Sequence, residues 1–534
     1  MPVDHSADYE ESTRMLRNSF NAALLSRIII LTGPAALAAC GAGAAADETL
    51  GADEQMLASA DVSDPSLLAC TTSATVDPAR SLMVTDQTAL NRFPLQDVFN
   101  QLISKANVAG PSSIGLYQRW WDSQNTTAGA VFPNAIHCDS YLDANGNPSI
   151  NGFPIQCPRN EGVLATSDPF SNLPTNGNFM KPVAIVNRFD LTPVDGSNCG
   201  EYRLIYAKKS GETNITDRNL IILEAVLPNP NPSCGIAACR PVAEFWANLS
   251  TLSDPNARAN ELARFYFQGL TGFSPVIHPA NFGMAGAGGA RHGQIRTNQF
   301  MSGPNNLIWQ LREFQLDRVC NPTCNLAIVP TTVKNNPFGP LFDVNFSDPR
   351  TASFQSSFIS EISSLSAQDA DLVVMNTSDM FNSGESNSTG TDNEYRFHLG
   401  TGPNTFTTAI DAELANIGRT DLTATNVADR ATTQSCGGCH QLSSGIGLGG
   451  LENGQPFVWP AHPSPFTFVH VSETSALSPA LTNVFLPHRK QVLESFLSTA
   501  SCTNCSSLAK PSVASGAAQK SGKRVRSLGG SVTH

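Results

Sequence analysis

The chain lacks the features that define several common classes of protein. After its first forty residues it has no apolar run long enough to span a bilayer as a helix. It contains no H-E-x-x-H zinc motif, no G-x-S-x-G nucleophile elbow and no P-loop for nucleotide phosphates. It also lacks an excess of positive charge: the formal net charge is -12, and an acidic chain repels phosphate backbones. We therefore expect no nucleic-acid partner.

One pentapeptide carries a specific chemical signal: Cys436-Gly437-Gly438-Cys439-His440. The pattern C-x-x-C-H is the attachment signature of c-type haem. Its two thiols can each form a thioether to a vinyl group of one porphyrin, and the following histidine can ligate the iron. In this motif region alone the chain resembles c-type cytochromes. The resemblance implies one covalent haem c on Cys436 and Cys439, with His440 as the proximal iron ligand.

Two other interpretations of these cysteines remain open. Cys436 and Cys439 could form a disulfide beside an incidental histidine. They could also share a zinc ion with Cys502 and Cys505, which form a second C-x-x-C. Zinc ribbons usually separate their cysteine pairs by about 15–20 residues, whereas here the whole of 440–501 intervenes, so the haem is favoured.

The chain has no methionine after Met380, so the usual sixth ligand of small electron-carrier cytochromes c is missing downstream of the motif. Histidine can replace it, and bis-histidine or five-coordinate iron has a lower potential than methionine-ligated iron. We prefer His470 as the distal ligand, then His488. The other imidazoles considered are His462 and His398. An open sixth position would instead permit peroxide or oxygen chemistry.

The N-terminus has the order of a secretory signal. Arg14, Arg17 and Arg27 precede the short apolar run 28–31, and small residues follow. Leu37-Ala38-Ala39-Cys40 resembles a bacterial lipobox, which implies cleavage before Cys40, lipidation of that cysteine and a place in the bacterial cell envelope, facing the periplasm or on the outer membrane. A core helix with a buried cysteine is the alternative.

Cysteine usage agrees with export. Of 13 cysteines, Cys40 would carry lipid and the two of the motif would carry haem, which leaves an even number for disulfides. Connectivity cannot be deduced from spacing alone. Neighbouring positions suggest the pairs Cys234–Cys239, Cys320–Cys324, Cys502–Cys505, Cys138–Cys157 and, as a long closure, Cys70–Cys199.

Composition divides the chain into five segments. We expect a lipoprotein signal peptide at 1–39, a flexible tether at 40–66, an α+β domain of unknown role at 67–345, a cytochrome c-like domain at 346–505 and a disordered basic tail at 506–534. No family is recognised for residues 67–345.

Periodicity predicts the elements within these domains. Strand-like runs at 183–191, 202–207 and 220–227 are separated by short connections, which predicts antiparallel pairing, and 295–301 with 307–316 reads as a hairpin. Helical patterns occupy 95–103, 242–249 and 257–267. The second domain is more helical, with patterns from Asp348, over 405–417 and from Asn426 into the motif, so we expect a mainly α-helical haem domain. The glycine-rich 445–450 predicts a loop close to the porphyrin rather than a dinucleotide site.

Three functions remain open from the sequence. The first is a membrane-anchored, exported mono-haem cytochrome that transfers electrons to an unknown redox partner. The second is a haem c enzyme, peroxidase- or oxygenase-like, with an open sixth site. The third is a surface lipoprotein without haem, stabilised by disulfides, that binds an extracellular ligand.

Overall fold

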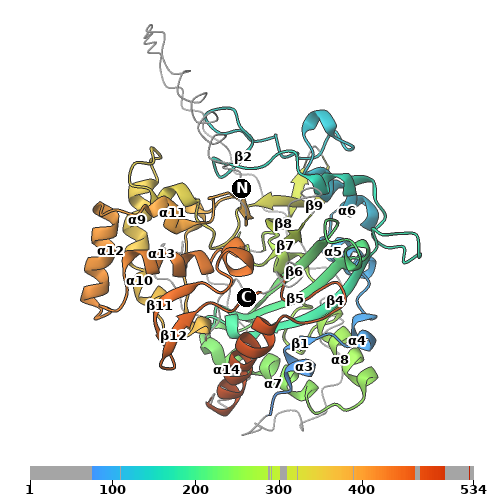
Figure 1. Cartoon of the computed structure of the whole chain (residues 1–534). Coiled ribbons are helices and arrows are strands. Elements are labelled where there is room, and N and C mark those ends of the chain that lie inside the picture. The colour runs from blue at the N-terminus through green and yellow to red at the C-terminus, as the bar shows by residue number, and fades with distance from the viewer. Residues whose placement is uncertain are drawn as a thin grey trace, which may run out of the picture. The chain divides into compact units, whose positions relative to one another are not determined.

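One antiparallel sheet of eight strands lies at the centre of the described part of the chain (Figure 1). The computed structural model describes residues 75–499, without 109, 287–288, 290, 301–308, 321–322, 389 and 463–468, together with Leu528. The strand order is β1-β4-β5-β6-β7-β8-β10, and β9 pairs with β8. The strands are β1 (Met83–Val84), β4 (Met180–Arg188), β5 (Asn198–Lys208), β6 (Asn219–Pro228), β7 (Gln294–Gln299), β8 (Gln310–Cys320), β9 (Cys324–Thr331) and β10 (Glu385–Asn387). A separate small hairpin joins β2 (Ser149–Ile150) to β3 (Phe153–Pro154).

The predicted strands are confirmed, and they are neighbours in the sheet. β4, β5 and β6 pair antiparallel, with Val186 opposite Arg203 and Arg203 opposite Glu224. The predicted pairing of 295–301 with 307–316 is present as β7 and β8, with Ile295 opposite Phe314. Together with the helices around it, this sheet makes the N-terminal region a mixed α+β structure, as the sequence predicted.

The helices of this region begin and end close to the predicted positions. Asp254 caps the helix that starts at Pro255, because its carboxylate accepts a hydrogen bond of 2.9 Å from the amide of Asn256. The helices are α3 (Pro78–Ser81), α4 (Gln87–Leu90), α5 (Leu95–Lys105), α6 (Ser113–Asp122), α7 (Arg240–Leu249) and α8 (Pro255–Phe267).

One face of the sheet, here called the aromatic face, is covered by these helices. Successive strand residues point to opposite faces, so one face receives the side chains of Tyr202, Tyr206, Leu223, Ile295 and Phe314. Tyr202 stacks on Trp246 of α7, with ring centroids 5.7 Å apart. Phe314 meets Trp120 of α6 edge-on, at 5.4 Å. This face is a conventional apolar core.

The opposite face, here called the charged face, carries ion pairs that are buried. Arg203 bonds Glu201 at 2.6 Å, and Glu224 receives both Arg203, at 3.3 Å, and Arg296, at 3.2 Å. Arg296 also bonds Glu313 at 3.0 Å. Arg188 belongs to the same face by register, and it bonds Asp190 at 2.8 Å. The strand periodicity therefore places charges where a core would be expected.

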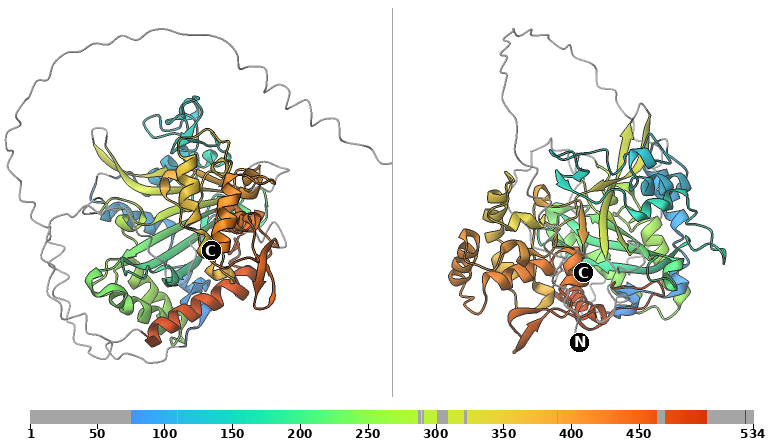
Figure 2. Two further views of the ribbon diagram at one scale, coloured as in Figure 1. Left: turned by 90° about the vertical axis from the view of Figure 1, so that its left-hand side faces the viewer. Right: turned by 45° about the horizontal axis from the view of Figure 1, so that its top comes forward.

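The C-terminal part is mostly helical, and its helices α9–α13 gather beside the sheet (Figures 1 and 2). They are α9 (Thr351–Ile359), α10 (Ile362–Leu365), α11 (Tyr395–Leu399), α12 (Thr405–Asn416), α13 (Ala424–Thr433) and α14 (Leu486–Thr499). The single helix expected from Asp348 is divided into α9 and α10, although its apolar residues stay buried. β10 pairs with β8, so this part contributes a strand to the central sheet. The described residues belong to one compact unit.

Disulfides confirm two predicted pairs and correct two others. Cys138 is joined to Cys157 and Cys320 to Cys324, as expected. Cys199 is joined to Cys239, so the predicted pairs Cys234–Cys239 and Cys70–Cys199 are wrong. The reason is tertiary: Cys199 in β5 and Cys239 before α7 lie 5.2 Å apart between Cα atoms although 40 residues separate them. Cys234 is also disulfide-bonded.

Several predictions fall outside the described residues. They are the signal at 1–39, lipidation at Cys40, the tether at 40–66, the pair Cys502–Cys505 and all of the tail at 506–534 except Leu528. Within the described residues, no helix combines the length and the apolar character needed to cross a bilayer.

Candidate functional site

The C-x-x-C-H motif directly follows α13, as predicted. Thr423 caps this helix through a capping box with Asn426, and after Thr433 the chain passes through the motif into a short π-helical turn, Gly438–Leu442. The amide of Gly437 donates a hydrogen bond of 2.8 Å to Ser386 Oγ on β10. A Cβ atom on Gly437 would lie 2.6 Å from the carbonyl oxygen of Asn387, and one on Gly438 would overlap the carbonyl of Thr432. Both residues between the cysteines must therefore be glycine.

The two motif cysteines differ from the other described cysteines. Cys436 and Cys439 are 2% and 0% exposed and are not joined by a disulfide. Every other cysteine in the described ranges is disulfide-bonded. Burial raises the pKa of Cys436 to about 12, against an opposing effect of Arg296, and burial also raises that of Cys439. Both side chains are therefore neutral thiols at neutral pH.

Three histidines gather beside these thiols. The His440 ring lies 4.9 Å from that of His470 and 6.5 Å from that of His462, between centroids. The rings of His462 and His470 are 5.6 Å apart. Trp309 stacks on His440 at 4.6 Å, with the ring planes 12° apart. The amide of Trp309 donates to Ser388 Oγ at 2.9 Å, which fixes the indole against the imidazole.

A cavity of about 50 Å³ lies between the charged face and the motif. Its wall is mostly apolar, and it also contains Cys436, His440 and His470. The apolar part comes from the sheet and from the C-terminal segment: Met83, Val186, Ile205, Leu220, Ile222, Leu311, Val469, Val471 and Leu481. Polar residues from the strands, Arg203, Glu224, Arg296 and Asn298, complete the wall together with Arg489 of α14.

The structure distinguishes between the histidines that were predicted as distal ligands. His470 lines the cavity with His440, and its Nδ1 lies 3.2 Å from Ser478 Oγ. His488 is not part of the cavity wall, where the next residue, Arg489, takes its place. His398 sits in α11, where its Nε2 lies 2.9 Å from the carbonyl oxygen of Thr391. The geometry therefore favours His470 over His488, and adds His462 to the group.

The glycine-rich segment is a strand rather than the predicted loop. Residues Gly447–Glu452 form β11, which pairs antiparallel with β12 (Gln455–Val458), so there is no dinucleotide-binding βαβ unit here. Gly449 has φ +70°, and a Cβ there would lie 2.5 Å from the side chain of Asn426 in α13. Arg430 donates to the carbonyls of Leu448 and Gly449, both at 2.8 Å. The glycines allow β11 to approach α13 closely.

Sequence reasoning missed the charged residues of this site. Arg203, Glu224 and Arg296 lie within strands that were predicted for their apolar residues. The sequence did contain a signal for them: charged residues occur at positions of these strands that share one face of the sheet. Charged side chains on a face of a buried sheet are unusual. Arg489 gave no such signal, because a single arginine on a helix is ordinarily exposed.

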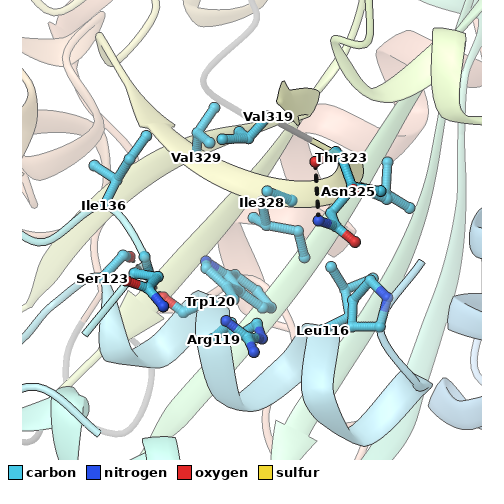
Figure 3. Close-up of a pocket in the computed structure, with 15 residues that line it drawn as sticks. Leu116, Arg119, Trp120, Ser123, Ile136, Val319, Thr323, Asn325, Ile328 and Val329 are labelled. Atoms are coloured by element: carbon cyan, nitrogen blue, oxygen red, sulfur yellow. Dashed lines mark hydrogen bonds between the residues drawn. The ribbon is translucent and has the colours of Figure 1, made fainter. Parts of the chain in front are cut away.

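Larger cavities lie elsewhere, and two of them border the β8–β9 hairpin. One, of about 480 Å³, is enclosed by α6 and the hairpin, with Trp120 and Arg119 below Val319 and Ile328 (Figure 3). The other, of about 560 Å³, lies against the disulfide region near Cys138 and contains Arg312 and Asp317. Neither is lined by a residue of the C-x-x-C-H motif.

The donor set beside the motif fits a covalently bound haem. It provides two reduced thiols, an imidazole next to them and further imidazoles within 7 Å. The 50 Å³ enclosed by the described residues is smaller than a typical cofactor site of about 300–1,000 Å³. The chain that connects His462 to Val469 lies outside the described residues. In the described ranges, no three or more His, Cys, Asp or Glu side chains are grouped as a metal site, whereas a porphyrin supplies its own four nitrogen ligands.

Comparisons of the chain with protein-family models, with curated proteins and with solved structures found no match.

Proposed function

We propose that this chain is an exported, membrane-anchored mono-haem c-type cytochrome, in which Cys436 and Cys439 carry the haem and His440 ligates its iron. The observation that carries the proposal is the state of these thiols. In a protein whose other described cysteines are all oxidised, two adjacent buried cysteines in a C-x-x-C-H motif are not joined to one another. Thioether formation needs reduced thiols, and a disulfide would block it.

The surroundings of His440 support its role as a ligand. Trp309 stacks on one side of the imidazole and limits its rotation. His470 faces the same cavity and is the proposed distal ligand, and His462 is the nearest alternative. Two imidazole ligands would favour a low potential and a six-coordinate iron.

Electron transfer is the proposed role, because a bound c-type haem supplies a one-electron couple. The protein would exclude water from the iron, since Cys436, Cys439 and His462 are nearly fully buried. The lipobox-like Cys40 would anchor the chain, and three described disulfides support an oxidising compartment. The redox partner is a second protein whose surface the haem edge contacts.

The test is to produce the full chain in a bacterial host with c-type haem attachment machinery. We expect a Soret band and one pyridine haemochrome per chain in the wild type. Cys436→Ala with Cys439→Ala should lose both signals. The matched control, Cys320→Ala with Cys324→Ala, removes another close cysteine pair but should retain the haem.

The spectrum separates the alternatives. A low-spin spectrum that becomes high-spin in His470→Ala supports a bis-histidine electron carrier. A high-spin wild type that responds to peroxide would favour the haem enzyme with an open sixth site. Absence of haem from the wild type, with the disulfides formed, would refute the proposal and leave the surface-binding lipoprotein.

A further inference from the structure

Arg489 is the one charged residue of α14 that faces the cavity. It is only 5% exposed, although it belongs to a residue type that is almost never buried without a partner. Its helix packs on the turn after β4, where Phe496 contacts Phe189 with ring centroids 4.8 Å apart. This packing places Arg489 in the wall of the cavity that Cys436, His440 and His470 also line.

The other arginines nearby each have a carboxylate partner. Arg188 bonds Asp190 at 2.8 Å, Arg203 bonds Glu201 at 2.6 Å, and Arg296 bonds Glu313 at 3.0 Å. Within the described residues, Arg489 has no hydrogen bond and no carboxylate within 4.0 Å. Burial lowers the pKa of Arg489 to about 9, and Arg188 adds to the effect, so the side chain is still a cation at neutral pH.

Two carboxylates, Asp190 and Asp371, lie near enough to raise the pKa of Arg489, but neither bonds it, and Asp190 is bonded to Arg188 at 2.8 Å. A buried cation that is only partly compensated is costly, and an anion from elsewhere can complete the compensation. The size and lining of the cavity indicate which kind of anion could bind. At about 50 Å³ the cavity has room for a group the size of a carboxylate. Its remaining wall is largely apolar, and Glu224 would repel a singly charged carboxylate less than a more highly charged anion such as phosphate. A guanidinium and a carboxylate match in a planar, bidentate pair.

We propose that Arg489 is a binding residue for a carboxylate attached to an apolar body, with the carboxylate at the part of the cavity wall that Arg489 forms. Two sources share this chemistry. One is a propionate side chain of the haem assigned above, and the other is a free small carboxylic acid. The first source rests on the proposed function, whereas the second does not, so the two can be tested apart.

The haem-free arm uses the full chain with Cys436→Ser and Cys439→Ser. We expect butyrate to raise its melting temperature, relative to chloride at equal ionic strength. In the same background Arg489→Met should weaken butyrate binding roughly tenfold or more. It should also raise the melting temperature without ligand, because a buried unpaired charge is removed. The control, Arg489→Lys, should keep part of the butyrate effect.

The haem-loaded arm compares the wild type with Arg489→Gln and Arg489→Lys at equal haem content. If a propionate is the carboxylate, Arg489→Gln lowers the midpoint potential, since an uncompensated negative charge favours ferric iron, and Arg489→Lys restores most of it. Arg489→Met should then lower the melting temperature, opposite in sign to the haem-free arm.

The outcomes are distinct. A butyrate effect without a potential shift assigns the site to a free acid, and a potential shift without a butyrate effect assigns it to the propionate. Neither effect, in folded protein, overturns the inference even if haem is attached. Loss of haem from the wild type refutes the proposed function alone, because the butyrate measurement stands. If Arg489→Met does not fold, Arg489→Lys is compared with the protein that keeps Arg489, both for the butyrate effect without haem and for the midpoint potential with haem.

Discussion

The two faces of the central sheet are both buried but are stabilised by different interactions. On the aromatic face Tyr202, Trp246 and Phe265 make stacked and edge-on contacts at 5.3–5.9 Å. On the charged face Glu224 lies between Arg203 and Arg296, with no exposure to solvent. Apolar burial stabilises the fold directly, whereas a buried ion pair often gains no more than its desolvation costs.

The charged face is the one that lies against the C-x-x-C-H motif. Ser386 on its edge strand bonds the motif at Gly437, and Arg296 is close enough to Cys436 to influence the pKa of its thiol. The sheet therefore has an apolar face and a charged face that borders the candidate site, and departures from apolar packing are expected at functional sites. Substitutions on the two faces should therefore differ in their effect on stability.

Trp246→Ala should have the largest effect on stability. The indole is fully buried against Tyr202 and Phe265, and its removal leaves a cavity in the aromatic face. We expect a loss of about 3–5 kcal/mol in the free energy of unfolding, measured in urea. The control, Tyr202→Phe, loses only the hydrogen bond of 2.7 Å to the carbonyl of Cys199 and should cost about 1 kcal/mol. Equal effects of the two variants would contradict the assignment.

Glu224→Gln tests the charged face. It removes a carboxylate shared by Arg203 and Arg296 and leaves part of their charge uncompensated. We expect a loss of about 3 kcal/mol, because breaking a buried pair costs more than the pair contributes. The matched control is Glu261→Gln, whose partner Arg264 is 45% exposed and which should change stability by less than about 1 kcal/mol. A loss as small as the control's would show that this face is hydrated.

Asp371→Asn tests the pH dependence of stability near Arg188 and Arg489, whose charges act on this carboxyl. Burial, reinforced by Asp369, raises the pKa of Asp371 to about 8. The folded state therefore holds a proton that the unfolded chain releases near pH 4, so stability falls as the pH rises from about 4 through 8. Replacement by asparagine should remove this fall, on the order of 2 kcal/mol, in urea unfolding at pH 5 and pH 8.

The graded control for that measurement is Asp369→Asn. It removes the second cause of the raised pKa and should make the fall in stability with pH shallower without abolishing it. An unchanged slope in Asp371→Asn would mean that another group holds the proton.

Local chemistry explains which parts of the fold were predictable. The strands around Ile205 and Ile222 and the helix capped by Asp254 follow from periodicity and capping, which act within a few residues. The pair Cys320–Cys324 was predictable for the same reason, since only four positions separate its members. The pair Cys199–Cys239 was not, because the packing of β5 against α7 determines it.

The residues of the candidate site also fall into a group that was predictable from the sequence and a group that was not. The sequence by itself determined the two thiols and the histidine after them, and the structure explains their glycine spacing through the carbonyls of Asn387 and Thr432. Only the tertiary structure brought His462 and His470 to His440 and turned Arg489 toward the same cavity. Distance along the chain explains the difference. The haem attachment proposed for Cys436 and Cys439 uses neighbours in sequence, whereas a buried charge and its surroundings come from strands and helices that meet only when the chain folds.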